Sequence, residues 1–128
     1  LNLLEKTLPS FDKNFVYCDI IKCWDQDPTL EYPSGGAGFA VPNSVFKKLR
    51  FQSELYDTKW SDVCLGLNFK KLNINMKQEG RFHAHPPHKH NLKLYEVPNH
   101  ISFHYIEGEN QKRLHDICQL PQKIYNFN

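Results

Sequence analysis

The densest group of chemically active side chains in the sequence is a run of histidines. His83 and His85 alternate along an expected extended segment, which places both side chains on the same side. The proline pair Pro86-Pro87 predicts a bend after them that could bring His88 and His90 together. Imidazole nitrogen is a good ligand for Zn, Mn, Fe or Ni ions. The run therefore suits a metal site, with an exposed polar loop of weak metal affinity as the alternative.

Acidic residues at two places in the sequence suit catalysis or metal binding. Asp62 follows Ser61 at the expected start of a helix, where a carboxylate commonly caps the helix or meets its positive end. Held rigidly beside a cleft, the same carboxylate could act as a general base. Asp25 and Asp27 form an Asp-x-Asp pair, an arrangement that holds Mn²⁺ or Mg²⁺ against a diphosphate. Because the pair lies beside a proline turn, where acidic residues are common, we interpret it as part of a loop.

A glycine-rich segment, Ser34-Gly35-Gly36-Ala37-Gly38, is the third candidate feature. So many glycines predict an irregular loop whose backbone can approach a flat or bulky ligand closely. The segment lacks the Gly-Lys-Ser/Thr ending of a Walker loop, and it leads into an apolar strand rather than a helix, which argues against a dinucleotide-binding fingerprint. A tight turn without a ligand is the alternative.

Both strands and helices are needed to position these groups. Aromatic, branched and alternating patterns predict strands, and apolar residues at helical spacing predict helices. The expected strands are 15–24, 39–41 and 101–105, and the expected helices are 43–49, capped by Asn43 or Ser44, 62–72 and 109–118. Residues 81–91 are expected to lack regular structure because of their prolines. The sequence therefore predicts a mixed α/β fold.

Composition narrows the classes of function. The chain has 128 residues, enough for one ordinary domain, and 16 Lys and Arg against 14 Asp and Glu give a net charge of +2. Such a balance does not predict nucleic-acid binding, and no apolar run approaches the ~20 residues of a membrane span. Aromatic residues make up 13% of the chain, enough to fill a core or line a sugar-binding cleft. The four cysteines contain no C-x-x-C pair and allow either two disulfides, in three pairings, or reduced thiols.

In their order along the chain, the motifs resemble the C-terminal half of the fringe-like β-1,3-glycosyltransferases. This group includes fringe, core 1 β-1,3-galactosyltransferase and the O-fucose β-1,3-glucosyltransferase. Its members carry a (Phe/Tyr)-x-(Ser/Thr)-Gly-Gly-(Ala/Gly)-Gly loop, an Asp-Val helix start, a Phe-His step and a late Ile-Ser-Phe-His strand. The counterparts here are residues 32–38, Asp62-Val63, Phe82-His83 and Ile101-Ser102-Phe103-His104.

The resemblance implies a GT-A-type α/β fold, with a mixed sheet and flanking helices. It also implies inverting transfer of a hexose or N-acetylhexosamine from a UDP-sugar to a glycan or to an O-linked sugar on a protein. Asp62 matches the group's proposed base, and His83 matches the histidine that joins a Mn²⁺ shell. Four positions match the lining of the donor and acceptor cleft: Tyr32, Gly35, Gly36 and Gly38.

Two departures from the group's pattern shape the expected domain organisation. Ser61-Asp62 stands where the group usually has two acids, so one carboxylate is lost. The group's metal-binding acidic motif lies on a strand well before the glycine loop, and Asp25 and Asp27 are too close to the loop to be that motif. We therefore expect residues 1–128 to be the C-terminal portion of such a domain, without its N-terminal nucleotide-binding half.

The resemblance also implies partners and a location. The partners are a UDP-sugar donor and a glycan or glycoprotein acceptor. The location is the lumen of the Golgi or endoplasmic reticulum, with a membrane anchor expected only in the full-length type II protein. One alternative is a non-catalytic carbohydrate- or metal-binding module derived from the same fold, and another is a small zinc-stabilised domain.

Overall fold

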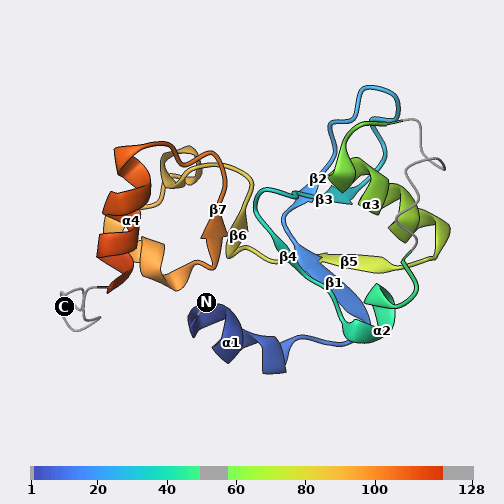
Figure 1. The fold of residues 1–128 in the computed structure, drawn as a ribbon, viewed down its shortest axis with the longest axis horizontal. Coiled ribbons are helices and arrows are strands. Elements are labelled where there is room, and N and C mark those ends of the chain that lie inside the picture. Colours follow the sequence, from blue (N-terminus) through green and yellow to red (C-terminus); the bar gives the residue numbers. More distant parts are fainter. Residues whose placement is uncertain (1, 50–57, 120–128) are drawn as a thin grey trace.

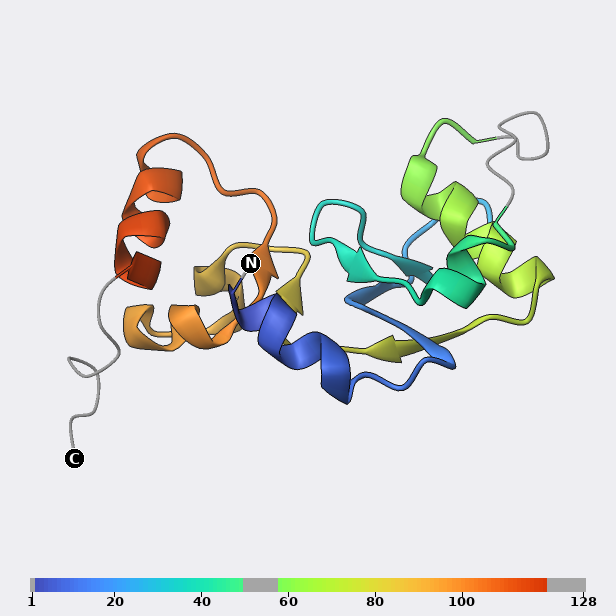
Figure 2. The same ribbon diagram turned by 60° about the horizontal axis from the view of Figure 1, so that its bottom comes forward.

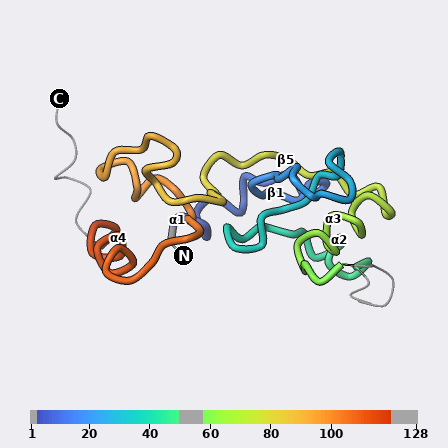
Figure 3. The backbone as a smooth tube through the Cα atoms, turned by 90° about the horizontal axis from the view of Figure 1, so that it is seen from above, coloured from blue at the N-terminus to red at the C-terminus, as the bar shows by residue number. Residues whose placement is uncertain are grey.

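The structure, a computed structural model, describes residues 2–49 and 58–119, and its elements form two neighbouring groups (Figure 1). The first group contains the helix α1 (Asn2–Thr7), the 3-10 helix η1 (Leu8–Ser10), the strands β1 (Phe15–Cys18), β2 (Ile20–Ile21), β3 (Tyr32–Pro33), β4 (Phe39–Ala40) and β5 (Asn75–Gln78), and the helices α2 (Asn43–Phe46) and α3 (Ser61–Lys71). The second contains the strands β6 (Phe82–His83) and β7 (Ser102–Phe103), the 3-10 helices η3 (Pro87–His90) and η4 (Leu94–Asn99), and the helix α4 (Glu109–Gln119). The two groups lie side by side along the long axis (Figure 3), and α1 lies near their boundary (Figure 2). Among the helices described, none is long and apolar enough to cross a membrane.

The main sheet has three strands in the order β4-β1-β5. β1 runs antiparallel to β4, with Tyr17 opposite Ala40, and parallel to β5, with Phe15 opposite Asn75. β2 pairs antiparallel with β3, and β6 pairs parallel with β7. The parallel pair of β1 and β5 is joined by a long connection that contains α2 and α3, as parallel strands require. The predicted α/β fold, with a mixed sheet and flanking helices, is confirmed.

Two hydrophobic clusters hold α3 against the strands. The first joins β1 to α2 and α3 through the buried side chains of Val16, Val45, Leu49, Leu65 and Phe69. The second joins α3 to β3 through Leu30, Tyr32 and Val63. Full burial of one such side chain contributes about 1.5–3 kcal/mol. The clusters therefore fix the position of α3, whose first turn carries Asp62.

A glycine allows α3 to lie very close to β3. A Cβ atom at Gly66 would overlap the Cβ of Tyr32 and would lie 2.8 Å from the carbonyl oxygen of Glu31. Backbone and Cβ atoms cannot move aside as the tip of a flexible side chain can. Only glycine therefore permits this spacing, and the helix start is held against the end of β3.

The predicted helices 62–72 and 109–118 are confirmed as α3 and α4, with small differences at their ends. Asp62 lies in the first turn of α3, and Lys70 and Lys71 lie in its last turn. These charges complement the partial charges at the two ends of a helix. The prediction for 43–49 was wrong in its cap: α2 ends at Phe46, and Pro42 occupies the N-cap position without a side-chain cap.

Three expectations about strands differ from the structure. The predicted strand 15–24 divides at Asp19 into β1 and β2, which pair with different strands, and it ends at Ile21. The predicted strand 101–105 shortens to β7, since Tyr105 has a φ of 56° and lies in the left-handed region. Residues 81–91, expected to be irregular, contain β6 and η3. β6 forms by pairing with a distant strand, which the local prolines do not reveal.

All four cysteines are free, so the reduced alternative holds. Cys18 is buried on β1, where burial raises the pKa of its thiol to about 12. The Cys23 sulfur lies 3.0 Å from the Tyr32 hydroxyl. The thiols therefore act as ordinary side chains rather than as covalent links.

Candidate functional site

The glycine-rich loop joins β3 to β4 and lies against the first turn of α3. A Cβ atom at Gly35 would lie 3.3 Å from the Cβ of Asp62 and 3.6 Å from its Oδ2. The other carboxylate oxygen, Oδ1, accepts a hydrogen bond of 2.9 Å from the Val63 amide. Asp62 is half-buried. One oxygen is thus fixed by the helix backbone, while the other faces the loop and is placed to accept a proton.

The His104 ring lies against the same loop at Gly36. A Cβ atom at Gly36 would overlap the His104 imidazole, so the absence of a side chain makes room for this ring. Ser102 on β7 donates a hydrogen bond through Oγ to the carbonyl of Ala37. Gly38 has a φ of 80°, a conformation that glycine adopts without strain. The loop therefore links Asp62 in the first group of elements to β7 in the second.

Tyr32, expected to line the cleft, is buried on β3 beneath α3. Its hydroxyl lies 3.0 Å from the Cys23 sulfur. Burial raises the pKa of Tyr32, and Cys23, Asp62 and Asp25 act in the same direction. Tyr32 is thus near the candidate base but packs within the protein.

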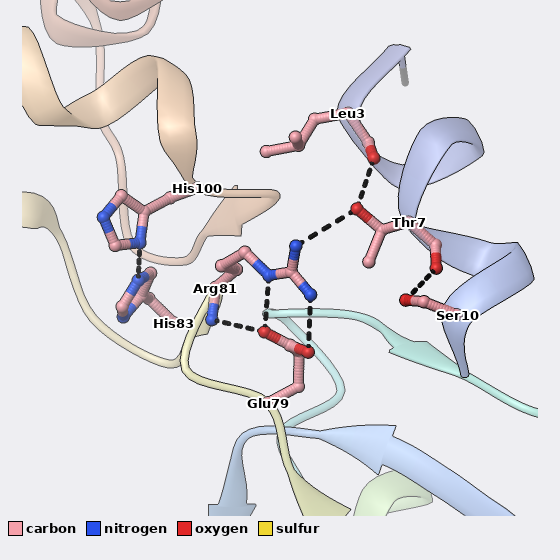
Figure 4. A network of polar contacts seen from close by, with 7 residues as sticks. All are labelled: Leu3, Thr7, Ser10, Glu79, Arg81, His83 and His100. Atoms are coloured by element: carbon pink, nitrogen blue, oxygen red, sulfur yellow. Dashed lines mark hydrogen bonds and ion pairs between the residues drawn. The ribbon is translucent and has the colours of Figure 1, made fainter. Parts of the chain in front are cut away.

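His83 lies on β6 and is only 7% exposed. Its Nε2 is 2.7 Å from Nδ1 of His100 (Figure 4), and its ring stacks on Phe103 with centroids 4.7 Å apart. Burial lowers the pKa of His83 to about 4, helped by His90 and His100 and opposed by Asp19. At neutral pH the imidazole is therefore uncharged, which is the form that binds metal ions.

The rest of the histidine run does not form a closed metal site. The His90 ring lies 4.4 Å from that of His83 and 6.2 Å from that of His85, measured between centroids. His90 Nε2 is buried without a hydrogen-bond partner, whereas His88 is exposed on η3. In residues 2–49 and 58–119, no group of three or more His, Cys, Asp or Glu side chains is arranged to hold a metal.

Asp27 of the Asp-x-Asp pair forms hydrogen bonds within its own loop, in line with the interpretation of the pair as part of a loop. Asp27 Oδ1 accepts hydrogen bonds from the amide and hydroxyl of Thr29, at 3.0 and 2.6 Å. These bonds lower the pKa of Asp27, and Lys70 at 3.5 Å adds to the effect. One acid of the pair is thus already committed to local contacts.

Asp19 connects the main sheet to the glycine loop and to the strand that carries His83. No pattern in the sequence indicates this role. Its Oδ2 accepts a hydrogen bond of 2.7 Å from the Ala84 amide, directly after His83. Its Oδ1 accepts one of 2.7 Å from the Gln78 side chain, and its carbonyl accepts one of 2.9 Å from the Ser34 amide. One residue therefore holds both the start of the glycine loop and the strand that carries His83.

A second network of polar contacts joins the segment between β5 and β6 to α1 (Figure 4). Arg81 donates two hydrogen bonds, from Nε and Nη2, to the carboxylate of Glu79 at 2.6 and 2.8 Å. Its third nitrogen, Nη1, donates to Thr7 Oγ1 at 3.2 Å, and Thr7 in turn donates to the Leu3 carbonyl at 2.7 Å. The segment that leads into β6 is thereby held against the N-terminal helix.

A family model described as Fringe-like matches residues 11–125. The chain belongs to the Fringe-like family. The predicted resemblance is therefore confirmed over most of the chain, and the family is one of Golgi-lumenal glycosyltransferases with a GT-A-type fold. A glycosyltransferase uses a sugar donor and a glycan acceptor in general. No curated protein and no solved structure matches the chain significantly.

For a Fringe-like protein, His83 has the features of one metal ligand rather than of a complete site. Its imidazole is neutral, and one ring nitrogen is already held by a hydrogen bond, as is usual for a histidine that binds a metal through the other. Among the described residues, His83 does not belong to any group of three or more His, Cys, Asp or Glu side chains that could hold a metal ion. A divalent ion here would thus take one ligand from His83 and further ligands from elsewhere.

A cavity of about 520 Å³ lies between β7 and α4 in this Fringe-like chain. Phe103, His104 and Tyr105 line it, and the rings of His104 and Tyr105 stack with centroids 3.8 Å apart. His104 also lies against Gly36, so one of the residues that line the cavity touches the glycine loop. The sequence placed His104 in a family motif but gave no role to its side chain.

Proposed function

We propose that this chain is the acceptor-side portion of an inverting β-1,3-glycosyltransferase. The enzyme would transfer a hexose or N-acetylhexosamine from a UDP-sugar to a glycan or to an O-linked sugar on a protein. The observation that carries the proposal is the Asp62 carboxylate, whose Oδ1 is fixed by the Val63 amide while Oδ2 faces Gly35. Family membership supports the reaction class.

In the proposed reaction, the acceptor hydroxyl lies between Asp62 Oδ2 and the anomeric carbon of the donor. The carboxylate takes the hydroxyl proton as the oxygen bonds to that carbon. The bond from the anomeric carbon to the UDP oxygen breaks, and UDP leaves with the electron pair. Attack from the opposite face inverts the configuration. Gly35 lets the loop backbone lie close to the Asp62 carboxylate, Gly36 makes room for the His104 ring, and Gly38 shapes the same loop, so we propose that these glycines line the donor and acceptor cleft.

We propose His83 as one ligand of the metal, with Mn²⁺ as the expected ion. When bound, such an ion offsets the negative charge that develops on the UDP leaving group. The neutral imidazole of His83 and its orienting contact with His100 support this assignment. A location in the lumen of the Golgi or endoplasmic reticulum, as a type II membrane protein at full length, follows from the same proposal.

Replacement of Asp62 by Asn in the full gene product tests the proposed base. Asn keeps an oxygen for the Val63 amide but cannot take a proton, so transfer should fall at least about 100-fold while UDP binding persists. Transfer is measured with radiolabelled UDP-hexoses and UDP-N-acetylhexosamines on secretory glycoproteins. The matched control is Asp27→Asn, which should keep full activity. Retained transfer in Asp62→Asn would remove Asp62 as the base.

The second candidate function is a non-catalytic carbohydrate- or metal-binding module. The observation that favours it is the cavity between β7 and α4, which is lined by the rings of Phe103, His104 and Tyr105. The two functions predict different results for the full gene product. A module binds sugars without releasing UDP from any donor, whereas the enzyme releases UDP in step with transfer to the acceptor.

A further inference from the structure

A second cavity, which we call the η3–α4 cavity, lies at the end of the molecule that carries α4 (Figure 1). Its volume is about 350 Å³, within the range of about 300–1,000 Å³ that is typical of small-ligand sites. Its lining includes neither Asp62 nor His83 nor any residue of the glycine loop. Its apolar walls are formed by Pro86, Pro87, Leu94, Ile106 and Leu114.

Four side chains with hydrogen-bonding groups also line the η3–α4 cavity. They are His88 on η3, Glu107 before α4, and Asn110 and Arg113 on α4. Within residues 2–49 and 58–119, none of the four makes a side-chain hydrogen bond or ion pair with another residue. Asn110 and Arg113 are three positions apart on a helix, which places both on one face. Together the four groups can donate hydrogen bonds to a ligand and accept them from it.

The charges in the cavity favour a neutral ligand that is rich in hydroxyl groups. Arg113 is positive and Glu107 is negative, so an anionic or a cationic ligand would meet a charge of its own sign. A purely apolar ligand would remove water from four polar groups without replacing its hydrogen bonds. A pyranose ring suits both surfaces, because its hydroxyls pair with carboxylate, amide and guanidinium groups while its C–H bonds pack against the apolar walls.

The segment from β7 to α4, which forms one side of the cavity, is held in a sharply bent conformation. Tyr105 has a φ of 56° and Gly108 a φ of 51°, so the chain turns on both sides of Glu107. Gln111 on α4 donates a hydrogen bond of 2.7 Å to the Ile106 carbonyl and fixes this bend. The left-handed conformation is unfavourable for a large residue such as Tyr105, and strained positions of this kind are concentrated at functional sites. The cavity is therefore already formed without a ligand.

We propose that the η3–α4 cavity binds one neutral pyranose unit of a glycan. Tyr105 lines the cavity and follows His104, whose ring lies against Gly36, while Asp62 lies against Gly35. The glycine loop thus connects the candidate base to the cavity. Under the proposed function, on which this assignment rests, the bound unit belongs to the acceptor and is not the sugar that receives the transfer. The acceptor is then a glycan of at least two sugar units.

NMR titration of the nitrogen-15-labelled 128-residue chain tests the binding, with neutral glycans released from secretory glycoproteins as the probe. We expect saturable shifts of the Asn110 and Arg113 amide signals. Arg113→Met keeps the apolar stem but removes the guanidinium, so it should weaken binding about 10-fold or more. The matched control is Lys112→Met, which removes a positive charge from the same helix outside the cavity and should keep the wild-type affinity. Lys112 and Arg113 are both exposed, so neither substitution threatens the fold.

Several results of this titration would overturn the inference. They are the absence of saturable shifts at Asn110 and Arg113, an equal affinity of Arg113→Met and the wild type, and tighter binding of sialylated than of neutral glycans. Shifts confined to His115 and Cys118 would place the sugar in the cavity between β7 and α4 instead, because these residues line that cavity and not the η3–α4 cavity.

Transfer kinetics of the full gene product test the role in acceptor binding. The wild type should have a KM about 10-fold lower for an acceptor of two sugar units than for the matching single sugar, and Arg113→Met should lose this difference while Lys112→Met keeps it. A difference that persists in Arg113→Met would overturn the acceptor assignment. Retained transfer in Asp62→Asn, or a wild type that transfers no sugar, would count against the proposed function alone, because the glycan titration uses no donor.

Discussion

Two single residues acquire their chemical character from their immediate contacts. Asp62 is an ordinary carboxylate until the Val63 amide fixes one oxygen and Gly35 leaves space at the other. His83 is an ordinary imidazole until burial, with His90 and His100 nearby, holds it neutral. The orientation of the Asp62 carboxylate and the neutral state of the His83 imidazole are thus produced by packing rather than by residue type.

The lowered pKa of His83 predicts that stability depends on pH. Between about pH 6.5 and pH 4, an unfolded His83 binds a proton that the folded one does not, so the unfolding free energy falls as the pH is lowered. The loss reaches about 2 kcal/mol at pH 5 and about 3 kcal/mol at pH 4. Urea unfolding at pH 7 and at pH 5, in the presence of a chelator, measures it.

The control for this effect is a pair of variants. His83→Gln should flatten the pH dependence, and His115→Gln should preserve it because His115 is exposed. Because burial also lowers the pKa of His100, some dependence of the same sign should persist in His83→Gln. Identical slopes for the wild type and His83→Gln would contradict the prediction.

At the scale of elements, the position of α3 depends on one glycine. The helix crosses β3 at Gly66, where any side chain would meet the backbone of Glu31 and the Cβ of Tyr32. The same helix carries Asp62 in its first turn. The distance between the candidate base and the glycine loop is therefore determined by packing in the middle of α3.

Gly66→Ala should destabilise the protein by about 1–3 kcal/mol, because the added methyl group forces α3 away from β3. The sign of this change in unfolding free energy distinguishes a crowded site from an open one, since alanine in an unconstrained helix would instead be favourable by about 1 kcal/mol. Gly80→Ala is the matched control, with no atom within 4 Å of its Cβ position. Denaturant unfolding compares the two, and a more stable Gly66→Ala would disprove the close approach.

At the scale of the whole molecule, Asp19 ties the two groups of elements together. Its carboxylate binds Gln78 within the main sheet and the Ala84 amide after β6, while its carbonyl binds Ser34. The contact of Ser102 with Ala37 adds a second connection near the loop. The glycine loop and His83 thus belong to one continuous structure although they lie in different groups.

Asp19→Ala should cost about 2–4 kcal/mol of unfolding free energy, because it removes two charge-assisted hydrogen bonds and leaves the Ala84 amide without its partner. Amide hydrogen exchange should accelerate most at Ala84. Asp116→Ala, on the exposed surface of α4, should change neither measurement. Unchanged exchange at Ala84 in Asp19→Ala would show that the link does not hold β6.

The sequence by itself predicted the features that depend on short stretches of chain. The helices α3 and α4 follow from apolar spacing and end charges, and the loop of Gly35, Gly36 and Gly38 follows from its glycines. The order of these motifs was enough to indicate the family. Such features are local, because helix periodicity and backbone freedom act over a few residues.

Only the tertiary structure decided which of these features meet. His83 and His100 are 17 residues apart, and Asp19 and Ala84 are 65 residues apart, so no local pattern relates them. The same holds for the short strand β6, which exists only because β7 pairs with it. Contacts of this kind form when the folded core brings distant segments together, and their energies depend on burial and geometry that propensities along the chain do not contain.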